Sequence, residues 1–119
     1  MTPEQLENRL INFAVEIIKV SSDLQKNNAG KNMSNQIVRS GTSPALNYGE
    51  ARSAESRKDF IHKIKIVLKE LRETGISLKI IEKAKLYKGK PDIFENVKTE
   101  CEALISIFVS STKTAQTKN

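Results

Sequence analysis

Apolar residues recur at helical spacing through almost the whole chain, and this pattern limits the fold more than any other feature. In the first segment they follow steps of three and four residues, at Leu6, Leu10, Phe13, Ile17, Val20 and Leu24. Such steps place the apolar side chains on one face of a helix. Strand signals are scarce, since there is no sustained period-two alternation and no Asn-Gly or Asp-Gly hairpin turn. The sequence therefore predicts an all-α fold.

Capping and turn residues divide this pattern into helices. Thr2 and Gln5 form a capping box around Pro3 at the start of the chain. Asn27 and a nearby glycine indicate the end of the first helix. The predicted helices cover residues 2–27, 32–54, 57–85 and 92–111. Because the connections are short, we expect an antiparallel up-down-up-down four-helix bundle.

The expected domain organisation is one bundle with a short tail. We assign residues 1–112 to the four-helix bundle and residues 113–119, which are polar, to a disordered tail. Inside the second predicted helix, Pro44 removes a backbone donor, so we expect a kink in residues 40–44. Small residues surround this proline and would let a neighbouring helix, or a neighbouring copy of the chain, approach closely: Ser40, Gly41, Ser43 and Ala45.

Several classes of function are disfavoured by the composition. With one cysteine and one histidine, tetrahedral zinc sites and disulfide frameworks are nearly excluded. Cys101 falls at core spacing, between Val97 and Leu104, and is expected to be a buried apolar residue. The longest uncharged runs, such as residues 103–112, are about half of the ~20 residues that span a bilayer. We expect a cytoplasmic protein that has no membrane partner, metal or cofactor.

Positive charge is concentrated in one part of the chain. The net charge is +6, but residues 57–90 hold eleven of the 20 basic residues and only four of the 14 acidic ones. Six of these cations have spacings that align them on one side of the third predicted helix, a set we call the basic row: Lys58, Lys65, Lys69, Arg72, Lys79 and Lys83. His62 shares this side.

Two interpretations of the basic row remain open. It is either a solvated helix face or a surface for the phosphates of a nucleic acid, for which one-sided positive charge is typical. Aromatic residues, on which bases stack, are absent from the row. Nucleic-acid binding would then be directed at the backbone and sensitive to salt.

Polar residues also align inside the bundle, and we call them the polar set. Its members lie in the second and third predicted helices: Arg39, Ser43, Asn47, Glu50, Glu70 and Glu73. One interpretation is a hydrogen-bond network between helices, because buried polar groups must be paired. The alternative is acid/base chemistry or a divalent ion at the carboxylates. No nucleophile–base pair or Glu-x-x-His pattern accompanies them. We therefore expect a structural network, with no catalytic or metal-binding residues.

Two segments carry a family resemblance: RSGTSPALNYGEA at residues 39–51 and KIKIVLKELRET at residues 63–74. The chain resembles the four-helix bundle family named for proteins encoded in intervening sequences of bacterial large-subunit ribosomal RNA genes. The matching positions include the polar set together with Ser40 and Thr74. Tyr48, Gly49 and Ala51 depart from the usual Ile, Ala and Gly of that family.

The resemblance implies a bundle that assembles as a ring-shaped homopentamer. It also implies similarity to the accessory variability determinant of diversity-generating retroelements, a basic pentamer that binds nucleic acid and a reverse transcriptase. Together with the basic row, it leads us to expect a non-enzymatic homo-oligomer that binds nucleic acid, RNA rather than DNA. The alternative is a protein-interaction adaptor that docks on a polymerase, such as a reverse transcriptase, or on a ribosome-associated partner.

Overall fold

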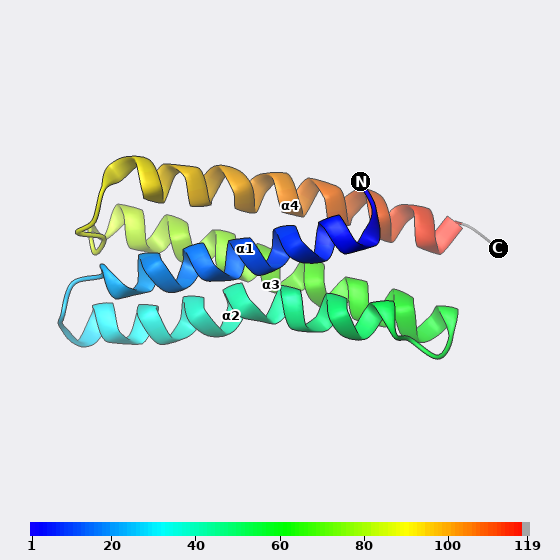
Figure 1. Cartoon of the computed structure of the whole chain (residues 1–119). Helices are drawn as coiled ribbons and strands as arrows, with labels where there is room; N and C mark the ends of the chain where they lie inside the picture. The colour runs from blue at the N-terminus through cyan, green and yellow to red at the C-terminus, as the bar shows by residue number, and fades with distance from the viewer. Residues whose placement is uncertain (118–119) are drawn as a thin grey trace.

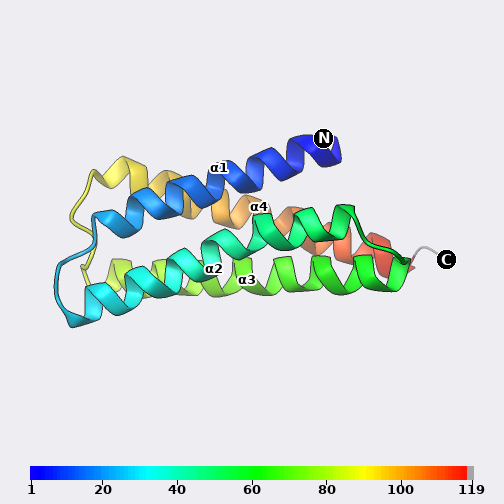
Figure 2. The same ribbon diagram turned by 60° about the horizontal axis from the view of Figure 1, so that its bottom comes forward.

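Four long helices make up nearly all of the structure, a computed structural model that describes residues 1–117. They are, in chain order, α1 (Pro3–Ser22), α2 (Asn28–Arg52), α3 (Arg57–Lys83) and α4 (Pro91–Thr117). Neighbouring helices in the chain run antiparallel, and the start of α1 and the end of α4 lie at the same end of the bundle as the α2–α3 connection (Figures 1 and 2). Each helix packs against the next, and a thinner contact between α1 and α4 closes the bundle. The predicted fold class is confirmed.

The helices begin at capping residues. Thr2 Oγ1 accepts a hydrogen bond from the backbone N–H of Gln5 at 3.1 Å, and the Gln5 side chain accepts one from the Thr2 N–H at 2.9 Å. These two bonds complete the predicted capping box. Asn27 has a different role from the expected one, because its side chain accepts from the Gly30 N–H at 2.8 Å and begins α2. The first helix ends earlier, at Ser22.

The fourth helix extends further than the sequence predicts. It continues to Thr117, so residues 113–117, expected in the disordered tail, are helical. The Arg57 guanidinium donates a hydrogen bond of 2.6 Å to the Ala115 carbonyl oxygen, which ties this end of α4 to the start of α3. Ala115 is also partly buried against the core. The last two residues of the expected tail, 118–119, lie outside the described residues.

The core is apolar and receives side chains from all four helices. Its largest fully buried members include Phe13 of α1, Ile37 of α2, Leu71 of α3 and Phe108 of α4. Cys101 is 1% exposed and belongs to this core, as its spacing predicts. Each helix thus turns one apolar stripe inward, because burying that stripe removes apolar area from water.

The small residues of α2 bring two helices of the same chain together. A Cβ atom on Gly41 would lie 2.7 Å from Cγ2 of Ile17, so α1 approaches α2 more closely than any side chain at this position permits. Gly41, Ser40 and Pro44 are buried inside the bundle, and α2 continues unbroken through Pro44. The expected close approach of a helix is confirmed, but the expectation that Ser40 and Gly41 face another copy is wrong.

Candidate nucleic-acid interface

The basic row lies on the outside of α3. Its spacing places its members opposite the buried face that contains Ile64, Leu71 and Leu78. All six side chains are exposed, and so is His62. None of the six forms an ion pair with another described residue, since every such pair in residues 1–117 uses other cations. The row therefore keeps its full positive charge available to a ligand in solution.

Acidic residues of the bundle pair instead with cations that the sequence pattern did not single out. Glu100 accepts from Arg9 at 2.7 Å, and these two residues join α4 to α1. Glu50 accepts from Lys63 at 2.6 Å, and this hydrogen bond raises the pKa of Lys63. Such pairs connect residues on different helices, so the periodicity within one helix cannot predict them. None of these acidic residues forms an ion pair with the basic row.

Lys98 on α4 is also paired with acidic residues, one on α3 and one on its own helix. It donates to both carboxylate oxygens of Glu82, at 2.8 and 2.9 Å, and lies 3.6 Å from a carboxylate oxygen of Glu95. The hydrogen bond to Glu82 is the main cause that raises the pKa of Lys98. Lys98 is thus a neutralised cation beside the row rather than an addition to it.

Three members of the polar set meet between α2 and α3. The Arg39 guanidinium lies 3.4 Å from a carboxylate oxygen of Glu70 and 3.4 Å from one of Glu73. The Glu70 side chain is only 10% exposed, whereas that of Arg39 is 63% exposed. The pair therefore spans the boundary between the packed interior and the surface.

A buried hydroxyl pair extends this contact inward. Thr74 Oγ1 lies 2.8 Å from the Glu70 carbonyl oxygen and 2.9 Å from Ser40 Oγ. Both residues are almost fully buried, so these bonds satisfy polar groups that have no access to water. The polar contact between α2 and α3 thus continues from the surface into the core.

The remaining members of the polar set are separate. Asn47 donates to the Ser43 carbonyl oxygen at 3.0 Å and to Ser43 Oγ at 2.8 Å, entirely within α2. Glu50 pairs with Lys63, as described above. The six residues do not form one network, and no group of three His, Cys, Asp or Glu side chains in the described part of the chain is placed to hold a metal ion.

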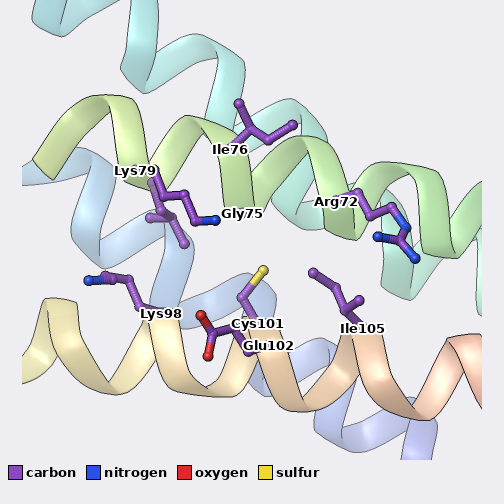
Figure 3. Close-up of a pocket in the computed structure, with 9 residues that line it drawn as sticks. Arg72, Gly75, Ile76, Lys79, Lys98, Cys101, Glu102 and Ile105 are labelled. Carbon is purple, nitrogen blue, oxygen red and sulfur yellow. The ribbon is translucent and has the colours of Figure 1, made fainter. Parts of the chain in front are cut away.

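A recess opens beside the basic row, between α3 and α4 (Figure 3). Its volume is about 210 Å³. Gly75 lies on the α3 side, while Cys101 and Ile105 extend toward it from α4. Arg72 and Lys79 belong to both the recess and the row. Gly75 interrupts the apolar pattern of its helix, and this interruption is the signal in the sequence that could have indicated the recess.

Over residues 1–117, none of the helices is long and apolar enough to cross a membrane. No curated protein matches the chain. The chain is similar to a solved structure from Bacteroides thetaiotaomicron, that of a protein of unknown function from the S23 ribosomal protein family. The two share 31% sequence identity with a TM-score of 0.80, and the match covers 91% of this chain and 98% of the other.

A sequence model of the 23S rRNA-intervening sequence protein family matches residues 5–110. The matched range contains the whole basic row, the polar set and the recess. The match extends over all four helices, from α1 to most of α4. The chain therefore belongs to the 23S rRNA-intervening sequence protein family.

Proposed function

We propose that this protein is a non-enzymatic RNA-binding bundle whose basic row contacts the phosphates of the nucleic acid. The observation that carries the proposal is the set of six exposed cations on one side of α3, none of which is paired with an acidic residue among residues 1–117. Exposed charge of this kind is compatible with solubility. Because the cations are concentrated on one side of the helix, they also create a positive field that attracts polyanions.

The dimensions of the row suit a nucleic-acid backbone. From Lys58 to Lys83 it extends roughly 37 Å along α3, at a rise of about 1.5 Å per residue. Neutralising phosphates along such a length releases counterions, so affinity should fall steeply with salt. RNA is preferred to DNA in this proposal because the name of the family refers to 23S rRNA.

The proposal includes assembly into a homo-oligomer, for which a homopentamer is expected from the resemblance to ring-forming bundles. Support comes from α1, whose outward side exposes three large apolar residues that we call the α1 apolar row: Ile11, Val15 and Ile18, at 44%, 44% and 47% exposure. These steps of four and three form a continuous stripe on a helix that is already packed on its opposite side. Contact with a second copy would remove this stripe from water.

Charge reversal tests the RNA proposal. The triple variant Lys65→Glu, Lys69→Glu, Arg72→Glu should lose retention on heparin and on structured RNA, with unchanged helicity by circular dichroism. A matched variant that reverses Lys26, Lys31 and Lys113, which are exposed but lie outside α3, should retain most of its binding. Equal binding by wild-type and triple-variant protein would overturn the assignment of the basic row.

The α1 apolar row also favours a second candidate, an adaptor that docks on a polymerase or a ribosome-associated protein. Apolar contacts depend little on salt, whereas phosphate contacts depend strongly on it. Filter binding to RNA across a salt series therefore separates the two. A steep loss of affinity with salt supports the RNA proposal, and no measurable RNA binding at low salt supports the adaptor.

A further inference from the structure

Gly75 forms part of the α3 wall of the recess between α3 and α4. A Cβ atom on Gly75 would lie 3.6 Å from Cys101 Sγ and 3.7 Å from Ile105 Cδ1, which is ordinary van der Waals contact. Alanine would therefore fit, whereas any larger side chain would project into the space. The walls are mostly apolar, and the recess, with a volume of about 210 Å³, is partly open to solvent.

Four charged residues line the recess: Arg72 and Lys79 on α3, and Lys98 and Glu102 on α4, of which Lys98 is already paired with Glu82 and Glu95. Arg72 and Lys79 lie on α3 on either side of Gly75, and Figure 3 shows them toward opposite ends of the gap. Burial is the main cause that raises the pKa of the Cys101 thiol to about 12, so the floor is uncharged at neutral pH. Glu102 lies at the rim on α4 and forms no ion pair with a described residue.

We propose that this recess binds a single base of an RNA strand, with the flanking phosphates on Arg72 and Lys79. The Glu102 carboxylate accepts a hydrogen bond from an amino group of the base. The inference rests on the proposed RNA binding and adds base recognition to the backbone contacts of the basic row. It also makes Gly75 and Glu102 specificity-determining residues.

The size and the chemistry of the recess fit this occupant. Pockets for drug-sized ligands typically have volumes of about 300–1,000 Å³, so a recess of about 210 Å³ admits one ring system but not a larger ligand. An apolar space between two cations matches the alternation of base and phosphate along a single strand. Proteins commonly recognise RNA at loops and bulges, where an unstacked base can turn outward.

Glu102 gives the recess a preference among bases. Its carboxylate only accepts hydrogen bonds when ionised. Adenine, cytosine and guanine each present an amino donor, whereas uracil has no amino group and its O4 atom is an acceptor that would face the carboxylate unfavourably. We therefore expect a cytosine-containing strand to bind more tightly than the same strand with uracil at that position.

The test compares RNA strands that differ only in their bases. Wild-type protein should bind a short single-stranded RNA about tenfold more tightly than a strand with the same phosphates but abasic sugars, a difference typical of burying one ring. Gly75→Leu should remove this difference by filling the recess, and it should leave the salt dependence unchanged. Gly75→Ala, which adds only a Cβ atom, is the matched control and should keep most of the difference.

Further measurements keep the two proposals distinguishable. Backbone amide signals of Gly75 and Cys101 in NMR spectra should shift further with the base-bearing strand than with the abasic one, which tests the recess in the unaltered protein. Glu102→Gln should reduce the preference for cytosine over uracil. Equal binding of base-bearing and abasic strands to the wild type would overturn base recognition and leave backbone binding intact. No binding of either strand at low salt would overturn the proposed function itself.

Discussion

A Cβ atom on Gly41 would lie 2.7 Å from Cγ2 and 2.9 Å from Cγ1 of Ile17, so the backbone of α2 packs directly on a core side chain of α1. Both residues are buried, and Ile17 is fully so. A separation this short leaves no room for a side chain unless the two helices move apart. The contact therefore sets the distance between α1 and α2 at the middle of the bundle.

Replacing Gly41 by alanine should destabilise the protein. The new methyl group forces Ile17 or the helix backbone to move, and overpacking of this kind costs about 1–3 kcal/mol. Gly49→Ala is the matched control on the same helix, because a Cβ atom there meets only Glu7 Oε2 at 3.8 Å. That variant should gain up to about 1 kcal/mol from the better helix propensity of alanine. Urea unfolding measures both changes, and equal stabilisation by the two variants would contradict the close contact.

The number and type of the elements were predictable because each helix must bury one apolar stripe. The stripe containing Leu10 and Phe13 can face only the core, whichever helix it meets there. The helix ends were less predictable. Asn27 begins α2 rather than ending α1, since one amide side chain can serve either end and local sequence does not decide between them. The end of α4 depends on the Arg57–Ala115 hydrogen bond, which joins distant parts of the chain.

The helical end of α4 leads to a prediction for a shortened protein. Removing residues 113–119 deletes the Ala115 carbonyl group that Arg57 contacts, but it leaves the core residue Phe108 in place. The shortened chain should fold, with a loss of stability below about 1 kcal/mol, because the lost hydrogen bond is exposed. Thermal unfolding followed by circular dichroism measures this loss. Arg57→Ala in the full chain should produce a similar small decrease.

Removing Arg39 should leave the nearly buried Glu70 carboxylate without its cation. We expect Arg39→Met to destabilise the protein by about 1 kcal/mol, a modest value because the guanidinium is largely exposed. Glu70→Gln should then rescue part of the loss, since the neutral amide does not need the cation. The measurement is a double-mutant cycle by urea unfolding. Fully additive effects of the two substitutions would show that the 3.4 Å contact contributes nothing.

The site was predictable to the extent that it follows helix periodicity. Positions of the basic row are set by their own spacing along α3, so the structure places all six on the exposed side. The pairing of the polar set could not be predicted, because it depends on how α2 is rotated against α3. This rotation brings Arg39 to Glu70 and Glu50 to Lys63. The interruption at Gly75 marks the α3 side of the recess, but the pattern within α3 does not show which α4 residues lie across from it.

The thiol of Cys101 should make stability depend on pH in the alkaline range. Its pKa rises from 9.0 to about 12 in the folded protein, chiefly through burial. Above pH 9 the unfolded chain loses this proton while the folded protein keeps it, so the free energy of unfolding falls as pH rises. The share due to this group is about 1 kcal/mol between pH 8 and pH 10.

Cys101→Ala provides the comparison for this prediction. The variant should be less stable at pH 8 because it leaves a small cavity, but its stability should fall less between pH 8 and pH 10. Urea unfolding at the two pH values gives both differences. Parallel decreases in the wild type and the variant would contradict a buried neutral thiol.

The α1 apolar row predicts how a single charge affects assembly. Val15 lies at the centre of the row, so Val15→Asp should place a carboxylate in the proposed contact with a second copy, where burying an unpaired charge is costly. Light scattering should then show the mass of one chain at concentrations where we expect the wild type to be oligomeric. Asn12→Asp adds the same charge to an exposed position of α1 outside the row and should leave the mass unchanged. Because Val15 is exposed in the single chain, helicity should be the same in both variants. Unchanged oligomeric mass for Val15→Asp would exclude the α1 apolar row as the contact between copies.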